Sequence, residues 1–124
     1  MDCYCDYDPP EFYSARIIKQ ARKQFTCDEC RGLILPGDSY ELIAGKWDGD
    51  FGTFHTCEMC RDLRVWVKNN VPCLCVMHGN MDEELKNAVE EATYRAPQET
   101  VGLRFGLLRR MKARDDRNSR RRAA

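Results

Sequence analysis

The cysteines are the residues of this chain whose type and spacing most directly indicate chemistry. All eight stand in close pairs, namely Cys3-x-Cys5, Cys27-x-x-Cys30, Cys57-x-x-Cys60 and Cys73-x-Cys75. Two thiolates on a tight turn can occupy two corners of a tetrahedron around Zn²⁺, and a second pair completes the coordination. The spacing therefore predicts two zinc sites, each with four thiolate ligands.

Disulfide bridges are the alternative interpretation of these pairs, and they accumulate in secreted proteins. The first residues, Met1 to Asp6, are acidic and lack the basic and apolar regions of a secretion signal. No apolar run approaches the roughly 20 residues that cross a bilayer. We therefore expect a soluble, cytoplasmic protein without membrane partners, in which paired cysteines bind metal more often than they form bridges. A redox dithiol remains the alternative for the Cys27 to Cys60 set.

The elements that must position these thiolates follow from local patterns. Between Cys30 and Cys57, turn signals at Pro36-Gly37-Asp38 and Asp48-Gly49-Asp50 predict a β-hairpin. After the hairpin, apolar residues at helical spacing predict a helix to Asn70, with Arg64 among its outward-facing residues. The second cysteine pair should lie at the start of this helix.

This order of elements resembles that of the treble-clef zinc fingers over about residues 25–70. The motifs that carry the resemblance are Cys27-Asp-Glu-Cys30, then Ile34, Gly37 and Tyr40, and His55-Thr-Cys57-Glu-Met-Cys60. It implies an α+β fold: a small zinc-stabilised domain with a treble-clef-like core and added C-terminal helices. Treble clefs bind nucleic acid, bind protein or, with added residues, cut DNA, so the resemblance implies only that range of functions.

The second predicted site joins Cys3, Cys5, Cys73 and Cys75 through one ion. Such a site would hold the N-terminal segment against the segment after the zinc-finger helix. An alternative ligand set replaces one thiolate with His78, because Cys75-x-x-His78 is also a workable spacing. The simplest alternative is that Cys3 and Cys5 are free thiols and that His78 is an ordinary polar residue.

Three segments of the chain have a recognisable pattern: Cys3 to Tyr13, Gly45-Lys-Trp-Asp-Gly-Asp50, and Val71-Pro-Cys-Leu-Cys75 followed by His78-Gly79. Through these segments the chain as a whole resembles small zinc-binding proteins of bacteriophages and prophages over roughly residues 3–85. This resemblance implies a phage accessory protein in the host cytoplasm that binds a host protein or protein complex of a defence or regulatory system. No mechanism comes with the resemblance.

Charge divides the chain into three segments. Residues 1–80 hold the zinc-binding core with the N-terminal segment, and residues 81–97 hold an acidic amphipathic helix predicted over Met81 to Tyr94. Residues 98–124 are basic, and we expect a helix over Val101 to Arg114 followed by a frayed arginine run. Gly102 and Gly106 each weaken that helix by about 1 kcal/mol relative to alanine.

The basic segment supports three interpretations. Its cations could bind nucleic acid with a steep salt dependence, its apolar stripe could lie on a partner protein or a second copy of the chain, or it could be a solvated tail. The candidate binding residues are Leu103, Leu107, Arg104, Arg109, Arg110, Lys112, Arg114, Arg120, Arg121 and Arg122.

Catalysis finds little support in the sequence. Four-thiolate zinc sites are closed, whereas catalytic zinc keeps an open position. The chain has two histidines, and a treble-clef nuclease would need His55 as a base and a further histidine on the helix after it, which is absent. We therefore expect a non-enzymatic zinc protein that binds a host protein, with nucleic-acid binding as the alternative and a zinc-dependent nuclease as the third hypothesis.

Overall fold

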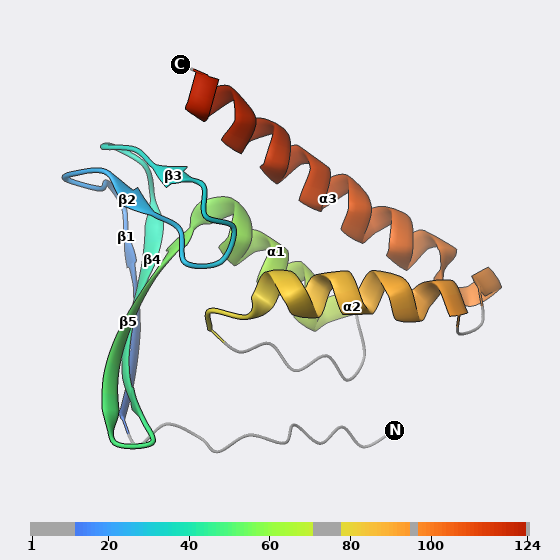
Figure 1. Cartoon of the computed structure of the whole chain (residues 1–124), viewed down its shortest axis with the longest axis horizontal. Coiled ribbons are helices and arrows are strands. Elements are labelled where there is room, and N and C mark those ends of the chain that lie inside the picture. Colours follow the sequence, from blue (N-terminus) through green and yellow to red (C-terminus); the bar gives the residue numbers. More distant parts are fainter. Residues whose placement is uncertain (1–11, 71–77, 95–96, 124) are drawn as a thin grey trace.

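The computed structural model describes residues 12–70, 78–94 and 97–123 and has an α+β fold with a small antiparallel sheet and three helices (Figure 1). The strands are β1 (Phe12–Ile18), β2 (Phe25–Thr26), β3 (Leu33–Ile34), β4 (Tyr40–Trp47) and β5 (Asp50–Cys57). The helices are α1 (Glu58–Asn70), α2 (Met81–Tyr94) and α3 (Pro97–Ala123).

The main sheet has the order β1-β4-β5, and β2 pairs with β3 in a separate two-stranded ribbon. The predicted hairpin is confirmed: β4 and β5 pair from Tyr40 opposite Cys57 to Trp47 opposite Asp50. Both residues between these strands, Asp48 and Gly49, have positive φ, as two-residue hairpin turns that match the strand twist require. The long hairpin carries Cys57 to the start of α1.

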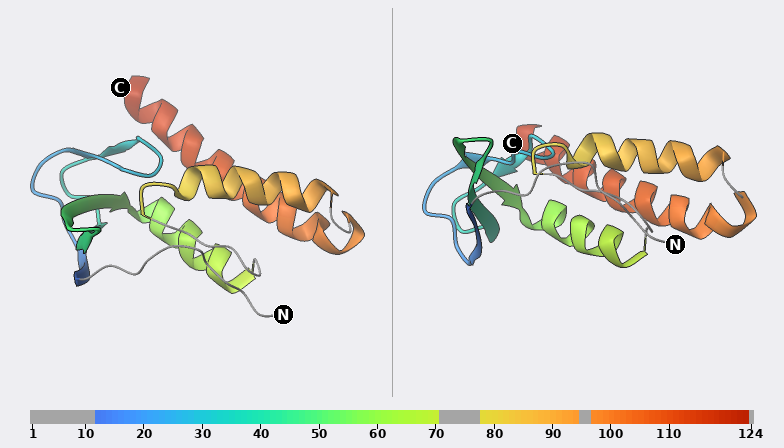
Figure 2. Two further views of the ribbon diagram at one scale, coloured as in Figure 1. Left: turned by 60° about the horizontal axis from the view of Figure 1, so that its bottom comes forward. Right: turned by 90° about the horizontal axis from the view of Figure 1, so that it is seen from below.

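The three helices lie on one side of the sheet, and Figure 2 shows α2 and α3 side by side next to α1. Their shared core contains Leu63 and Val67 of α1, Leu85 of α2, and Leu107 and Met111 of α3. Burial of each such side chain contributes about 1.5–3 kcal/mol. The acidic and basic helices therefore pair within one chain through their apolar faces.

Two features differ from the expectations. Strand β1 is not predicted by the sequence, because the residues from Phe12 to Ile17 are all exposed and show no alternation of buried and exposed positions. Helix α3 continues to Ala123, past the expected end at Arg114. The arginine run is helical because Arg121 and Arg122 bind residues of the segment from Arg31 to Asp38.

The two glycines of α3 offer a matched test of its packing. A Cβ at Gly106 would lie 2.8 Å from ring carbons of Trp66, whereas a Cβ at Gly102 would meet nothing within 4 Å. We expect Gly102→Ala to raise the free energy of unfolding by up to about 1 kcal/mol through helix propensity. Gly106→Ala should lower it by about 1–3 kcal/mol through overpacking. Urea unfolding at fixed zinc concentration measures both, and equal effects of the two changes would contradict the packing of α3 on Trp66.

Candidate metal centre

Four cysteines from three elements meet at one point of the fold. The sulfur atoms of Cys27, Cys30, Cys57 and Cys60 all lie within 4.8 Å of one another, and the Sγ atoms of Cys30 and Cys57 are 3.8 Å apart. Four sulfurs at the Zn–S distance of about 2.3 Å in a tetrahedron are separated by about 3.8 Å. The cluster therefore fits one metal ion such as Zn²⁺.

The ribbon of β2 and β3 shapes the first ligand pair. The amide of Cys27 donates to the carbonyl of Gly32 at 2.8 Å, and the turn is completed by Arg31 at a φ of 63°. Within this turn the amides of Glu29 and Gly32 donate to the sulfurs of Cys27 and Cys30 at 3.4 Å each. Amide donors stabilise thiolate charge, so the turn is prepared for metal-bound sulfur.

The second ligand pair spans the junction of β5 and α1. Cys57 is the last residue of β5, and its amide donates to the sulfur of Cys27 at 3.4 Å. Cys60 lies in the first turn of α1 and is fully buried. The strand-to-helix transition thus places two sulfurs on the same side of the backbone.

The turn from Cys27 to Gly32 is the zinc knuckle, and Asp28 and Glu29 fasten it to its surroundings. Asp28 accepts the amide of His55 at 2.7 Å and donates its own amide to the carbonyl of that residue at 2.8 Å. The buried carboxylate of Glu29 accepts the amides of Gly79 and Met81 at the start of α2. Burial raises the pKa of Glu29, while these amide donors oppose the shift. The knuckle therefore caps α2 as well as contributing ligands.

The four sulfur atoms are crowded enough to influence the ionisation of one another. Hydrogen bonds to the neighbouring thiols raise the pKa of Cys27 and Cys60 and lower that of Cys30, and they lower the pKa of Cys57 to about 6. Four thiolates this close cannot all be ionised without a compensating positive charge. A bound dication would supply that charge and would allow all four thiolates to act as ligands.

Helix α3 covers the cluster with polar side chains. Arg117 donates to the sulfur of Cys57 at 3.3 Å, Asn118 to that of Cys30 at 3.3 Å, and Arg114 to that of Cys60 at 3.8 Å. Burial disfavours the charge of Arg114, but its interactions with Cys60 and Asp82 outweigh this and raise its pKa. Arg117 and Asn118 were not among the candidate site residues, although their spacing from Arg114 places all three on one helical face.

The remaining candidate residues of α3 have varied surroundings. Arg121 binds the carbonyl of Leu33 and the carboxylate of Asp38, and Arg122 binds the carbonyl of Arg31. Arg110 lies over the ring of Trp66 and donates to the carbonyl of Gly106, and Lys112 pairs with Asp116. Arg104 and Leu103 are half-buried, Arg109 and Arg120 are exposed, and Leu107 is in the core. Much of the basic segment therefore holds the fold together, and Leu107 is inaccessible to a partner.

The second predicted site lies outside the described residues, which omit Cys3, Cys5, Cys73 and Cys75. His78, the alternative ligand, is hydrogen-bonded through Nε2 to the hydroxyl of Tyr13 at 3.0 Å and stacks on that ring. Burial, followed by the charge of Arg64, lowers the pKa of His78. His55 stacks on Phe25 and lies 3.8 Å from Asp28, so in the described structure neither histidine belongs to the four-cysteine cluster.

Comparisons with known proteins yield no relative for this chain: no family model, no curated protein and no solved structure matches it. Within the part of the chain that the structure describes, none of the helices has the length and apolar content needed to cross a bilayer.

Proposed function

We propose that this protein is a non-enzymatic zinc-binding module with a treble-clef-like core, which acts by binding an acidic segment of another protein. The assignment of that partner to a host defence or regulatory system, and of this chain to phage accessory proteins, rests on the sequence resemblance over residues 3–85 alone. The observation that carries the binding proposal is a pocket in which arginines face an apolar floor.

The metal site supports a structural role. Four sulfurs fill the coordination sphere of a tetrahedral ion, and side chains of α3 cover three of them. Such a site leaves no open position for a substrate or an activated water. Cys27, Cys30, Cys57 and Cys60 would hold the ion, whose contribution is to join the knuckle, the hairpin and α1.

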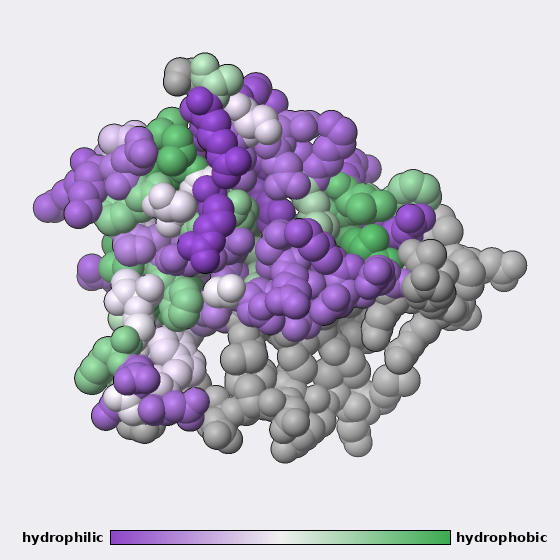
Figure 3. Space-filling model, in the orientation of Figure 1, coloured by the Kyte–Doolittle hydropathy of each residue, from purple (hydrophilic) through white to green (hydrophobic). Residues whose placement is uncertain are grey.

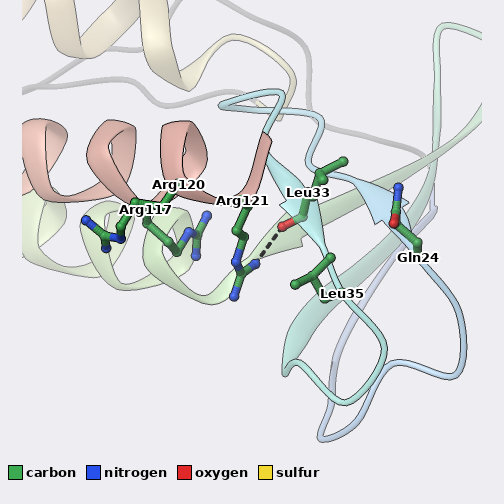
Figure 4. A pocket seen from close by; sticks show the side chains of 6 residues that line it. All are labelled: Gln24, Leu33, Leu35, Arg117, Arg120 and Arg121. Atoms are coloured by element: carbon green, nitrogen blue, oxygen red, sulfur yellow. Dashed lines mark hydrogen bonds between the residues drawn. The ribbon is translucent and has the colours of Figure 1, made fainter. Parts of the chain in front are cut away.

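The pocket lies between the β2–β3 ribbon and the C-terminal end of α3 and has a volume of about 440 Å³. Figure 4 shows Leu33 and Leu35 opposite arginines of α3, with the guanidinium of Arg121 directed at the carbonyl of Leu33. The other residues that line the pocket are Gln24, Arg117 and Arg120. In the space-filling view, apolar atoms gather around the ribbon beside a strongly hydrophilic band at the end of α3 (Figure 3).

The charges in this pocket favour an acidic, partly apolar ligand. Arg117 and Arg121 are held by the sulfur of Cys57 and by Asp38, so their positions are fixed before binding. The side chain of Arg120 is exposed and has no hydrogen-bond or ion-pair partner among the described residues. A carboxylate accepts paired hydrogen bonds from a guanidinium, while a neighbouring apolar side chain can cover Leu33 and Leu35.

Nucleic-acid binding by the basic segment is the second candidate. Many phosphate contacts would be needed for strong binding, because each neutralised phosphate contributes separately to affinity and salt dependence. In this fold Arg114, Arg117 and Arg121 are engaged with thiols, carboxylates or carbonyls of the same chain. Of the exposed cations of this segment, Lys112 and Arg122 also have partners within the chain. The pocket adds an apolar floor that a phosphate backbone would not use, so we place protein binding first.

Selection from a random peptide display library tests the proposal. We expect peptides selected on the zinc-loaded protein to be enriched in Asp or Glu beside Leu, Ile, Val or Phe. Arg120→Glu should weaken their binding at least about 10-fold through charge reversal. Arg109→Glu is the matched control, since it makes the same charge change at an exposed position of α3 outside the pocket.

Three results would overturn the proposal. The first is the absence of acidic enrichment, and the second is equal weakening by the two substitutions. The third is tight binding of labelled single-stranded or duplex DNA or RNA that falls steeply between about 50 and 200 mM salt, which would favour the nucleic-acid hypothesis.

A further inference from the structure

One face of α3, from Arg114 to Asn118, lies on the sulfur cluster. Arg114, Arg117 and Asn118 follow one another at helical spacing, and their side chains donate to the sulfurs of Cys60, Cys57 and Cys30. Three of the four candidate ligands therefore have a donor from a single helix, which is distant from all of them in sequence.

These contacts involve buried groups. The side chain of Arg114 is only 3% exposed, and its second amine donates to Asp82 of α2 at 2.6 Å. Asn118 is likewise buried, at 5% exposure. Buried donors of this kind are costly unless they are satisfied, and here the cluster sulfurs supply acceptors.

Charge balance explains why two of the three donors are arginines. A Zn²⁺ ion with four thiolate ligands carries a net charge of −2, which is unfavourable in a buried site without nearby positive charge. Arg114 and Arg117 supply two positive charges at the sulfurs. Because Asp82 and Asp115 also pair with Arg114, the two arginines offset part of the charge of the thiolate centre rather than all of it.

The knuckle is shaped to admit α3. A Cβ at Gly32 would lie 2.1 Å from the side-chain oxygen of Asn118, although the φ of Gly32 is in the range that other residues adopt. The backbone conformation does not require glycine at position 32. Glycine is needed there because a larger residue would occupy the space of the Asn118 side chain. Beyond this contact, Arg121 and Arg122 bind carbonyls of Leu33 and Arg31.

From these observations we propose that Arg114, Arg117 and Asn118 are positioning residues of the metal centre, and that docking of α3 and retention of the metal are coupled. This inference rests on the proposed zinc site but not on the proposed peptide binding. Coupling is reciprocal: if docked α3 strengthens metal binding by some factor, bound metal strengthens docking by the same factor. The C-terminal helix is then released when the metal is lost.

Zinc transfer from the loaded protein to pyridylazoresorcinol measures the proposed effect. Outer-shell partners of metal ligands contribute about 10–100-fold to metal affinity, so we expect Arg117→Gln, Asn118→Ala and Gly32→Ala each to accelerate zinc loss about 10-fold or more. Arg120→Gln is the matched control, because it removes the same charge from the same part of α3 without touching a sulfur. It should leave the rate unchanged.

A spectroscopic measurement separates this role from a general loss of stability. In Co²⁺-substituted protein, the sulfur-to-cobalt charge-transfer band should move to lower energy when the donor at Cys57 is removed by Arg117→Gln. Arg117→Lys, which keeps the charge, should restore part of the shift. Hydrogen exchange of residues 107–123 in zinc-loaded Gly32→Ala should become faster than in the wild type.

The outcomes distinguish the existence of the metal site from the role of α3 at that site. Wild-type protein that contains no zinc after purification under reducing conditions would refute the metal site itself. Zinc-containing protein in which Arg117→Gln and Arg120→Gln behave alike in both zinc transfer and the cobalt spectrum would refute only the role of α3.

Discussion

Removal of the metal ion is expected to unfold the core of this protein rather than loosen it. Structural zinc in finger peptides contributes about 10–16 kcal/mol of apparent binding free energy near neutral pH. A whole domain is typically stable by only about 5–15 kcal/mol. Because the knuckle, β5 and α1 all present ligands to one cluster, loss of the ion leaves crowded thiols where these elements meet.

Circular dichroism of the reduced protein, before and after addition of a chelator, measures this effect. We expect the near-ultraviolet signal and the cooperative thermal transition to disappear with the chelator and to return on addition of Zn²⁺. Cys57→Ser should reproduce the loss, whereas the exposed Ser119→Ala should not. A chelated sample that kept both signals would show that the apolar core suffices for folding.

The number of ions is settled by elemental analysis of the same sample. One zinc per chain would account for Cys27, Cys30, Cys57 and Cys60, the cluster in the described structure. Two zinc ions, with all eight thiols titratable after denaturation with chelator, would support the predicted second site at Cys3, Cys5, Cys73 and Cys75. That site remains a prediction.

The second large effect is expected from Glu41→Gln. Glu41 of β4 and Arg64 of α1 form an ion pair in which the two side chains are only 10% and 12% exposed. Removing one partner of a buried pair costs about 3–5 kcal/mol, because the other charge remains buried without compensation. We therefore expect the free energy of unfolding to fall by about that amount.

Urea unfolding at fixed free zinc concentration measures the change, because bound metal shifts apparent stability by mass action. The exposed pair of Lys112 and Asp116 provides the control, and Lys112→Ala should change stability by less than about 1 kcal/mol. The double change of Glu41→Leu with Arg64→Met should recover most of the loss, since an apolar pair of similar volume avoids the desolvation penalty. Equal effects of Glu41→Gln and Lys112→Ala would contradict the burial of the pair.

The sequence predicted those elements that are specified by residues close to one another in the chain. The hairpin of β4 and β5 follows from its turn residues, and α2 occupies the predicted range from Met81 to Tyr94. The cysteine pairs are also locally specified, because a Cys-x-x-Cys turn positions two sulfurs by itself. Each cysteine pair could therefore be predicted from local spacing, and the resemblance to treble clefs predicted that the two pairs meet in one cluster.

Contacts between distant segments could not be predicted in this way. Arg64 has the sequence position of an outward-facing helical residue, yet it is buried against Glu41 of β4. Strand β1 gains its conformation from pairing with β4 rather than from its own pattern. Both outcomes depend on long-range partners, for which a local pattern carries no signal.

The sequence by itself predicted the cluster of Cys27, Cys30, Cys57 and Cys60, because thiol chemistry and the spacing within each cysteine pair are local properties. Only the tertiary structure decided the use of the basic C-terminal segment. Its charge pattern is compatible with a nucleic-acid contact, a partner surface or a solvated tail, but Arg114, Arg117 and Asn118 meet the cysteine sulfurs. The reason is that α3 packs on α2 and α1 through its apolar face, which brings Arg114 and Arg117 against the cysteine cluster.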